Sequence, residues 1–304
     1  MSNKGVDQTD WHYVADDTVH VLPNGERIRI AREALENMAE QINKNRFFPL
    51  TVEHLDFEPP VGRLIDAELF TDAAGVTFLR AKHQLIRPEI VDTEWPAVTA
   101  SDAAEEPMLD DRISVSLQLE KRNFPSDVLE ELKSESPVEV SEFSAYSQLP
   151  PLEYLFVFTV GLGGLCLREY LKGFFGAVGK LSAQNLASFI RRFGAKALSP
   201  ERTRVVTFRF EGLPQEVIVT GHILDAGAND LTRQLQDVPE LGQLAETVVQ
   251  ELPPGLIQAA FIHDGECWQL AWYVTDGPAV FRTEWFSKNE PPYEDVLGHP
   301  LGQG

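Results

Sequence analysis

Three side chains of this sequence have the types and the setting that nucleophilic catalysis requires. His54 follows the apolar run 49–52 and stands directly before the turn-forming stretch 56–60, whereas Ser114 and Glu139 each lie in an alternating, strand-like stretch. A serine hydroxyl becomes an effective nucleophile when a base removes its proton, and that base needs a third group to fix its tautomer. These residues therefore predict His54 as the base, Ser114 as the nucleophile and Glu139 as the orienting acid. The alternative for His54 is a partly exposed histidine at a strand end with no chemical role.

The same region resembles the prohead maturation proteases of tailed phages, whose fold is similar to that of herpesvirus assemblin. The resemblance spans residues 20–150 and is carried by a helix that ends near Asn43, an extended stretch from Pro49 to His54, Pro60-Val61-Gly62 before an apolar strand, Arg-Ile-Ser-Val at 112–115 and Glu-Val-Ser at 139–141. It implies a small, mostly antiparallel β-barrel and a serine peptidase that cuts protein substrates, itself included. It also implies the same three roles for His54, Ser114 and Glu139. The chain departs from the family at Ser116, where the family has glycine, and a β-carbon there restricts the backbone beside the nucleophile.

Length and charge limit the classes of protein to which the chain can belong. With 304 residues, 43% of them hydrophobic, it has enough apolar side chains for more than one core. A formal net charge of −21 argues against a nucleic-acid partner, because an acidic surface is repelled by phosphate. The N-terminal residues have no apolar signal segment, and Cys166 and Cys267 form no metal or redox motif. We therefore expect a cytoplasmic protein in which both thiols are buried.

The distribution of charge suggests a division of the chain into domains. Residues 1–150 carry a net charge of −15, residues 151–202 carry +4, and residues 203–304 carry −10. A basic, glycine-rich helical segment at 151–202 is thus predicted between two acidic domains, the barrel-like domain 1–150 and a second domain at 203–288. The opening residues are polar and predicted to be frayed, and the proline- and glycine-rich tail 289–304 is predicted to be disordered.

The segment 151–202 allows three interpretations. Its apolar run 152–167 is shorter than the ~20 residues of a spanning helix, and six glycines are distributed between residues 161 and 179. It can form a buried glycine-rich hairpin that docks between domains or drives self-association into an oligomer. It can also associate with a membrane surface through an apolar face with basic flanks, or form a single-pass anchor. An amphipathic helix is expected at 181–198.

The C-terminal domain is predicted from alternating stretches. The succession strand, strand, helix, strand, strand, strand (ββαβββ) over residues 203–288 indicates an α+β domain with an antiparallel sheet. Its aromatic residues Trp268, Trp272, Tyr273 and Trp285 form either a ligand platform or the packed face of this sheet. His222 and His263 lack the spacing of metal ligands and are expected to be structural or exposed. The whole chain is therefore predicted to have an α+β fold.

Two functional hypotheses follow from these patterns. The first is a serine peptidase of the prohead-protease type, which cuts itself in the acidic loop 89–111. The second is an inactive peptidase-like sensor or defence effector whose segment 151–202 acts on a membrane or through self-association. The sequence contains neither a phosphate-binding glycine loop nor histidines or cysteines at metal-ligand spacing, so it predicts no cofactor and no metal.

Overall fold

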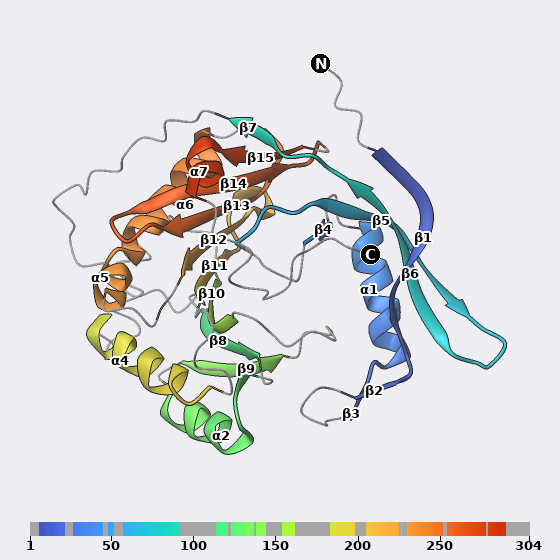
Figure 1. Ribbon diagram of the computed structural model, residues 1–304, viewed down its shortest axis with the longest axis horizontal. Helices are drawn as coiled ribbons and strands as arrows, with labels where there is room; N and C mark the ends of the chain where they lie inside the picture. Colours follow the sequence, from blue (N-terminus) through green and yellow to red (C-terminus); the bar gives the residue numbers. More distant parts are fainter. Residues whose placement is uncertain are drawn as a thin grey trace.

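The computed structural model describes most of the chain. The residues it describes are 6–21, 27–44, 48–51, 57–91, 114–120, 123–136, 138–143, 154–161, 183–197, 205–224, 226, 230–251, 254–277 and 279–289. They form one four-stranded sheet, one nine-stranded sheet and a two-stranded ribbon, with helices against both large sheets (Figure 1). The predicted α+β class is confirmed. Each large sheet ends in an edge strand within the described residues, so the closed barrel stays a prediction.

The four-stranded sheet is built from the N-terminal third of the chain. Its order is β1 (Val6–Asp16), β6 (Thr77–Leu85), β5 (Gly62–Thr71) and β4 (Phe48–Leu50), all antiparallel. The ribbon is the antiparallel pair of β2 (Val19–Val21) and β3 (Arg27–Arg29). Helix α1 (Arg32–Lys44) packs on one face of the sheet, where its apolar stripe meets Ala67, Leu79 and Ala81.

A β-bulge fixes the end of α1 on this sheet. The register of β5 shifts between Ile65 and Ala67, and Asp66 between them has a positive φ of 52°. The side chain of Asn43 closes over the bulge, because its amide donates to the carbonyl of Ala67 at 2.8 Å and its oxygen accepts from the amide of Ala67 at 2.7 Å. The helix therefore ends on a backbone group that the bulge leaves unpaired.

The nine-stranded sheet takes strands from each of the three parts into which the charge distribution divides the chain. Its order is β7 (Glu89–Val91), β15 (Val280–Thr283), β14 (Trp268–Thr275), β13 (Leu256–His263), β12 (Ile218–Ile223), β11 (Val205–Glu211), β10 (Tyr154–Gly161), β8 (Ser114–Glu120) and β9 (Glu139–Phe143). The proposed boundaries at residues 150 and 202 therefore do not separate sheets. Strand β8 from the first predicted domain reaches β11 of the last through β10.

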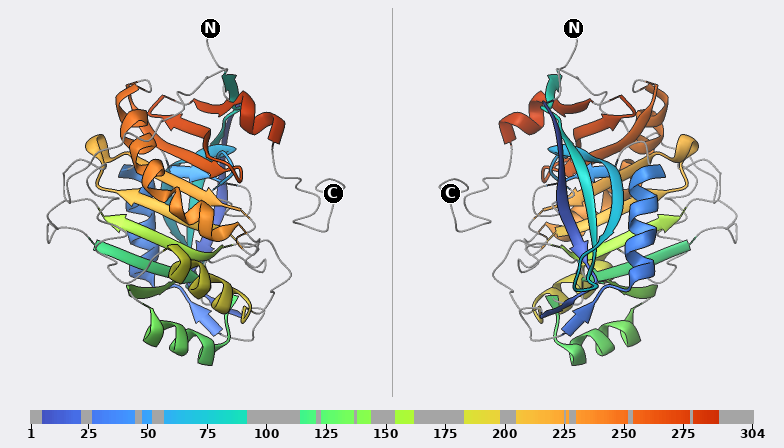
Figure 2. Two further views of the ribbon diagram at one scale, coloured as in Figure 1. Left: turned by 90° about the vertical axis from the view of Figure 1, so that its left-hand side faces the viewer. Right: turned by 90° about the vertical axis from the view of Figure 1, so that its right-hand side faces the viewer.

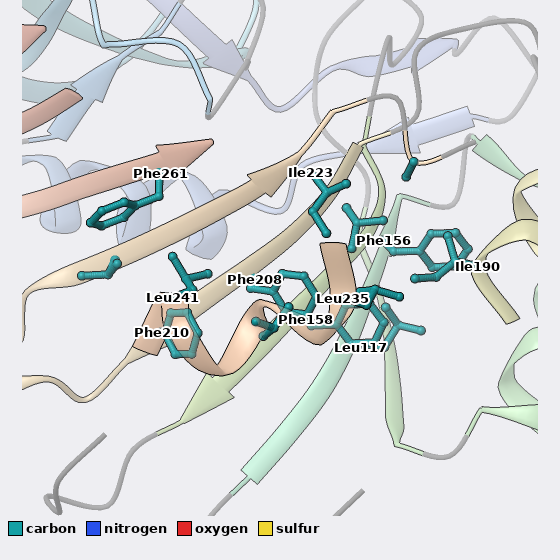
Figure 3. Packing of buried hydrophobic residues seen from close by; sticks show 14 of the residues in the cluster. Leu117, Phe156, Phe158, Ile190, Phe208, Phe210, Ile223, Leu235, Leu241 and Phe261 are labelled. Atoms are coloured by element: carbon teal, nitrogen blue, oxygen red, sulfur yellow. The ribbon is translucent and has the colours of Figure 1, made fainter. Parts of the chain in front are cut away.

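One face of the nine-stranded sheet is covered by helices. These are α2 (Ser126–Glu135), α4 (Ala183–Gly194), α5 (Leu231–Gln236) and α6 (Val238–Glu251), which Figures 1 and 2 show stacked along one side. Figure 3 shows side chains of this core, among them Leu117, Phe158 and Phe208 from the strands and Ile190 from α4. The other face, here named the second face, is turned toward α1 and the four-stranded sheet. Helix α7 (Glu284–Asn289) follows β15 directly.

Ion pairs join α2 to α4 at the end of this layer. Arg192 of α4 contacts Glu131 at 2.5 Å and Glu135 at 2.6 Å, both on α2, and Lys196 also bonds to Glu131. These cations lower the pKa of Glu131 through hydrogen bonds and charge. Basic side chains of the predicted amphipathic helix therefore form ion pairs with another helix of the same chain.

The structure corrects three local predictions. The opening residues expected to fray include β1, an eleven-residue strand that pairs with β6, whereas residues 1–5 lie outside the described part of the chain. The apolar run expected to be helical contains β10, because a short run of aromatic and β-branched residues fits a central strand as well as a buried helix. The C-terminal sheet is mixed, since the helical crossover through α5 and α6 brings β13 parallel to β12. The succession ββαβββ itself is confirmed, with the helix divided into α5 and α6.

Candidate functional site

The three predicted catalytic residues differ in how far the structure describes them. His54 lies outside the described residues, in the interval between Thr51 and Phe57. Ser114 begins β8, and its backbone is in register with Gly161 of β10. Glu139 begins β9, where its side chain is exposed and its register partner is Ser116. Two of the three positions therefore lie on neighbouring parallel strands at one end of the nine-stranded sheet.

The alternation of β8 shows which face these positions occupy. Leu117 and Leu119 are fully buried in the helix-covered core, so Ser116 belongs to the second face. Position 114, two residues earlier on the same strand, has the same parity. Glu139 shares this face because it is the register partner of Ser116. Positions 114, 116 and 139 thus occupy one face of the sheet.

The chain that follows His54 returns to this same face. Phe57 is buried, and its carbonyl accepts a hydrogen bond of 2.8 Å from Nε1 of Trp272. Its ring meets the imidazole of His222 edge to face, with 6.3 Å between ring centroids. Trp272 pairs with Ala260 on the second face. The chain just after His54 is therefore fixed onto the second face by a buried hydrogen bond and by aromatic packing.

His222 is a buried and neutral histidine at the centre of this face. Its Nδ1 lies 3.0 Å from the hydroxyl of Thr207 on β11, and its Nε2 lies 3.1 Å from the hydroxyl of Thr220 on its own strand. Burial lowers the pKa of His222 to about 3, so the ring stays uncharged at neutral pH. Both ring nitrogens are occupied, which confirms the structural role expected from the sequence.

Thr159 is a residue of this face that the sequence did not indicate. It lies on β10, where its register partners are Ser116 of β8 and Arg209 of β11. Its hydroxyl is buried and has no hydrogen-bond partner in the part of the chain that the structure describes. Thr159 becomes a neighbour of Ser116 only through the pairing of β8 with β10, which brings residues 43 positions apart side by side. A polar row therefore runs across the sheet from exposed Glu139 through Ser116 to buried Thr159.

A second histidine, His263, ends β13 near the start of α6. Its Nε2 lies 3.0 Å from a carboxylate oxygen of Asp237, and its Nδ1 accepts the amide proton of Gly265 at 3.1 Å. Because Nδ1 is an acceptor, Nε2 carries the proton and donates to Asp237. The ring also meets Trp268 edge to face at 5.0 Å. His263 therefore fastens the turn after β13 and has no free nitrogen to act as a base.

The aromatic and cysteine predictions have different outcomes. Trp268, Trp272 and Tyr273 are buried by packing on the two faces of the sheet. For these three residues this confirms the interpretation as sheet packing and not the interpretation as a ligand platform. Cys267 is exposed, contrary to the prediction that it is buried, because it lies in the turn between β13 and β14. Partial desolvation of the thiol, together with the charge of Asp264, raises its pKa. Cys166 lies outside the described residues.

Two further observations concern the functional hypotheses. No group of three or more histidine, cysteine, aspartate or glutamate side chains among the described residues could hold a metal ion. Of the helices in the described ranges, none combines the length and apolar character that crossing a membrane requires. In comparisons with known proteins, no family model, no curated protein and no solved structure matches this chain. The geometry of the second face is therefore the basis on which a function can be proposed.

Proposed function

We propose that the protein is a serine peptidase in which Ser114 attacks the substrate carbonyl, His54 removes the proton of the serine and Glu139 orients the imidazole. The observation that carries the proposal is the shared face. Positions 114 and 139 have the parity of the second face, and the chain returns to that face at Phe57, three residues after His54. Phe57 and position 139, which are 82 positions apart in sequence, thus belong to one side of one sheet.

The chain length between His54 and Phe57 is compatible with this assignment. Three residues of extended chain span at most about 11 Å, and neighbouring strands lie about 4.8 Å apart. From β12, where Phe57 packs on His222, three strand spacings lead to β8 and amount to about 14 Å. The row of His222 meets β8 at Gln118, four residues or about 13 Å along the strand from Ser114, so the whole separation is about 19 Å. The extended segment covers about 11 Å of it, and the lengths of the imidazole and of the serine side chain cover the rest only when the segment runs straight toward Ser114.

The chemistry is acyl transfer followed by hydrolysis. The serine oxygen forms a bond to the scissile carbonyl carbon while its proton passes to the imidazole. The same imidazolium then gives that proton to the leaving amine, and water releases the acid product by the reverse steps. A carboxylate beside the imidazole stabilises the charge that forms in between. An assemblin-like arrangement and cleavage within residues 89–111 belong to this proposal as its expected fold and substrate.

A fluorophosphonate probe tests the proposal directly, because it labels only a serine that a base has activated. We expect labelling of the wild type, loss of labelling in Ser114→Ala, and a reduction of at least about a hundredfold in His54→Gln. Ser116→Ala is the matched control, since it removes a hydroxyl from the same strand and the same face. Labelling that survives Ser114→Ala and disappears in Ser116→Ala would transfer the role to Ser116 and refute the assignment.

Storage of the purified chain gives a second readout of the same activity. If the peptidase cuts itself, the wild type develops a break within residues 89–111 and Ser114→Ala does not. Mass spectrometry of the fragments locates the break. Identical fragments from both proteins would show that another protease produced them.

The alternative, in which residues 151–202 act on a membrane or drive self-association, has less to support it. Phe156 and Phe158 of β10 and Leu186 and Phe193 of α4 are all buried in the helix-covered core. The apolar side chains of these elements are thus engaged within the molecule. The alternative then depends on residues 162–182, which lie outside the described part of the chain, and no observation favours it over the peptidase.

A further inference from the structure

Two histidines that are distant in sequence meet on the four-stranded sheet, which does not contain Ser114. His12 of β1 and His83 of β6 have ring centroids 4.1 Å apart, with an angle of 54° between the ring planes. The register of the two strands shifts between Gln8 and His12, and this bulge brings His12 toward His83. His12 is exposed and His83 is half-buried.

Neither imidazole has a hydrogen bond or an ion pair with any residue in the described ranges. Their only described contact is with each other. Two imidazoles in contact have four ring nitrogens between them, and an ordinary structural pair uses at least some of these on carboxylates or carbonyls, as His263 does. The pair therefore presents ligand atoms that the fold itself does not use.

The neighbouring cations lie on the opposite face of the sheet. Arg80 bonds to Glu68 and Lys82 bonds to Asp66 at 3.0 Å, and both cations lie over the ring of Trp11 at about 5 Å. Lys82 precedes His83 directly, so the alternation of β6 separates its ammonium group from the imidazole. No lysine or arginine of this strand thus repels a cation from the histidine side, and the net charge of −21 favours one.

We propose that His12 and His83 form a binding site for a borderline divalent cation of the copper, nickel and zinc group. Neutral imidazole is a preferred ligand of these ions. Metal–nitrogen bonds of about 2.1 Å place two rings on a shared ion with centroids about 5 Å apart, within about an ångström of the observed separation. Water completes the coordination, and the ion holds β1 to β6 across the bulge.

Copper titration of the full chain, free of any affinity tag, tests the site. Trp11 directly precedes His12, so Cu²⁺ bound between the histidines quenches its fluorescence. We expect partial quenching that saturates at one equivalent, with the affinity weakened at least about tenfold in His12→Gln and in His83→Gln. His20→Gln is the matched control, since His20 lies near the same sheet and already bonds to Asp16 at 2.8 Å. Its titration should equal that of the wild type.

Zinc provides an independent readout, because a ligand that binds only the folded chain raises its thermal midpoint. The wild type and His20→Gln should gain stability in excess Zn²⁺, and the two site variants should gain none. His12 is exposed, so His12→Gln is expected to fold normally in the absence of metal. Quenching and thermal shifts that are identical in the wild type and in both site variants would overturn the proposal. So would the lack of any saturable effect in the wild type.

Discussion

The buried imidazole of His222 makes the stability of this protein depend on pH in a specific way. In an unfolded chain a histidine has a pKa near 6.5, whereas burial lowers the pKa of folded His222 to about 3. Between these values the unfolded chain binds one proton that the folded chain does not. The contribution of neutral His222 to the free energy of unfolding is therefore complete above about pH 6.5 and is lost as the pH falls toward 3. The slope is roughly 1.4 kcal/mol per pH unit, so the loss at pH 4.5 is about 3 kcal/mol.

His222→Gln removes this proton while keeping one donor and one acceptor for the two threonine hydroxyls. We expect the variant to be less stable than the wild type at pH 7, because the amide fills the site less well than the ring. Its free energy of unfolding should nevertheless fall less steeply with acid, by roughly 1.4 kcal/mol per pH unit between pH 6 and 4. Urea unfolding, followed by tryptophan fluorescence at four or five pH values, measures both slopes.

Thr220→Val is the matched control for this experiment. It removes the hydrogen bond to Nε2 of His222 and leaves a buried polar atom unpaired, which costs about 1–3 kcal/mol at every pH. The histidine remains, so the difference of one proton between the folded and unfolded states also remains. The control should therefore be destabilised with the wild-type slope. Parallel stability curves for the wild type and His222→Gln would show that His222 is not the group that titrates, and the reasoning would fail.

Three further substitutions test the packing of the nine-stranded sheet. A β-carbon at Gly221 would lie 2.1 Å from a methyl of Leu241, so Gly221→Ala should lower the free energy of unfolding by about 1–3 kcal/mol, and less in a Leu241→Ala background. Trp272→Phe and Trp268→Phe each remove one indole hydrogen bond of 2.8 Å and should cost about 1–3 kcal/mol in urea. Only the first releases the chain beside the proposed site, so only Trp272→Phe should reduce probe labelling of Ser114. Equal labelling in both variants would contradict this link.

The C-terminal elements were predictable because their signals are local. Residues 205–223 alternate around a glycine-containing turn, and the helix before Leu256 has a clear apolar period, so strand and helix were assigned correctly. The apolar run at 154–161 was not predictable in this way. A continuous apolar stretch of that length fits a central strand and a buried helix equally well, and its neighbours β8 and β11 decide between them.

The site was predictable only as a set of residue types. The sequence indicates a base, a nucleophile and an acid, but strand register decides which residues become neighbours. Glu139 is paired with Ser116, and Ser116 with Thr159, and none of these pairings is visible in sequence spacing. The same holds for His12 and His83, which are 71 positions apart and fit no local ligand motif. Spacing rules detect metal ligands that share a turn or a helix, and they miss ligands that meet across a β-bulge.

The interior position of β10 in the sheet explains how the fold supports the proposed nucleophile. β8 is held on one side by β9, five residues long, and on the other by β10, which is in turn parallel to the largely buried strand β11. Leu117 and Leu119 fix β8 to the helix-covered core, so the alternate positions 114 and 116 are held on the second face. Position 114 thus begins a strand that is paired on both sides, whereas the chain of the proposed base is tied to the sheet at Phe57. In this arrangement the sheet fixes the nucleophile, and the segment between Thr51 and Phe57 determines whether the base reaches it.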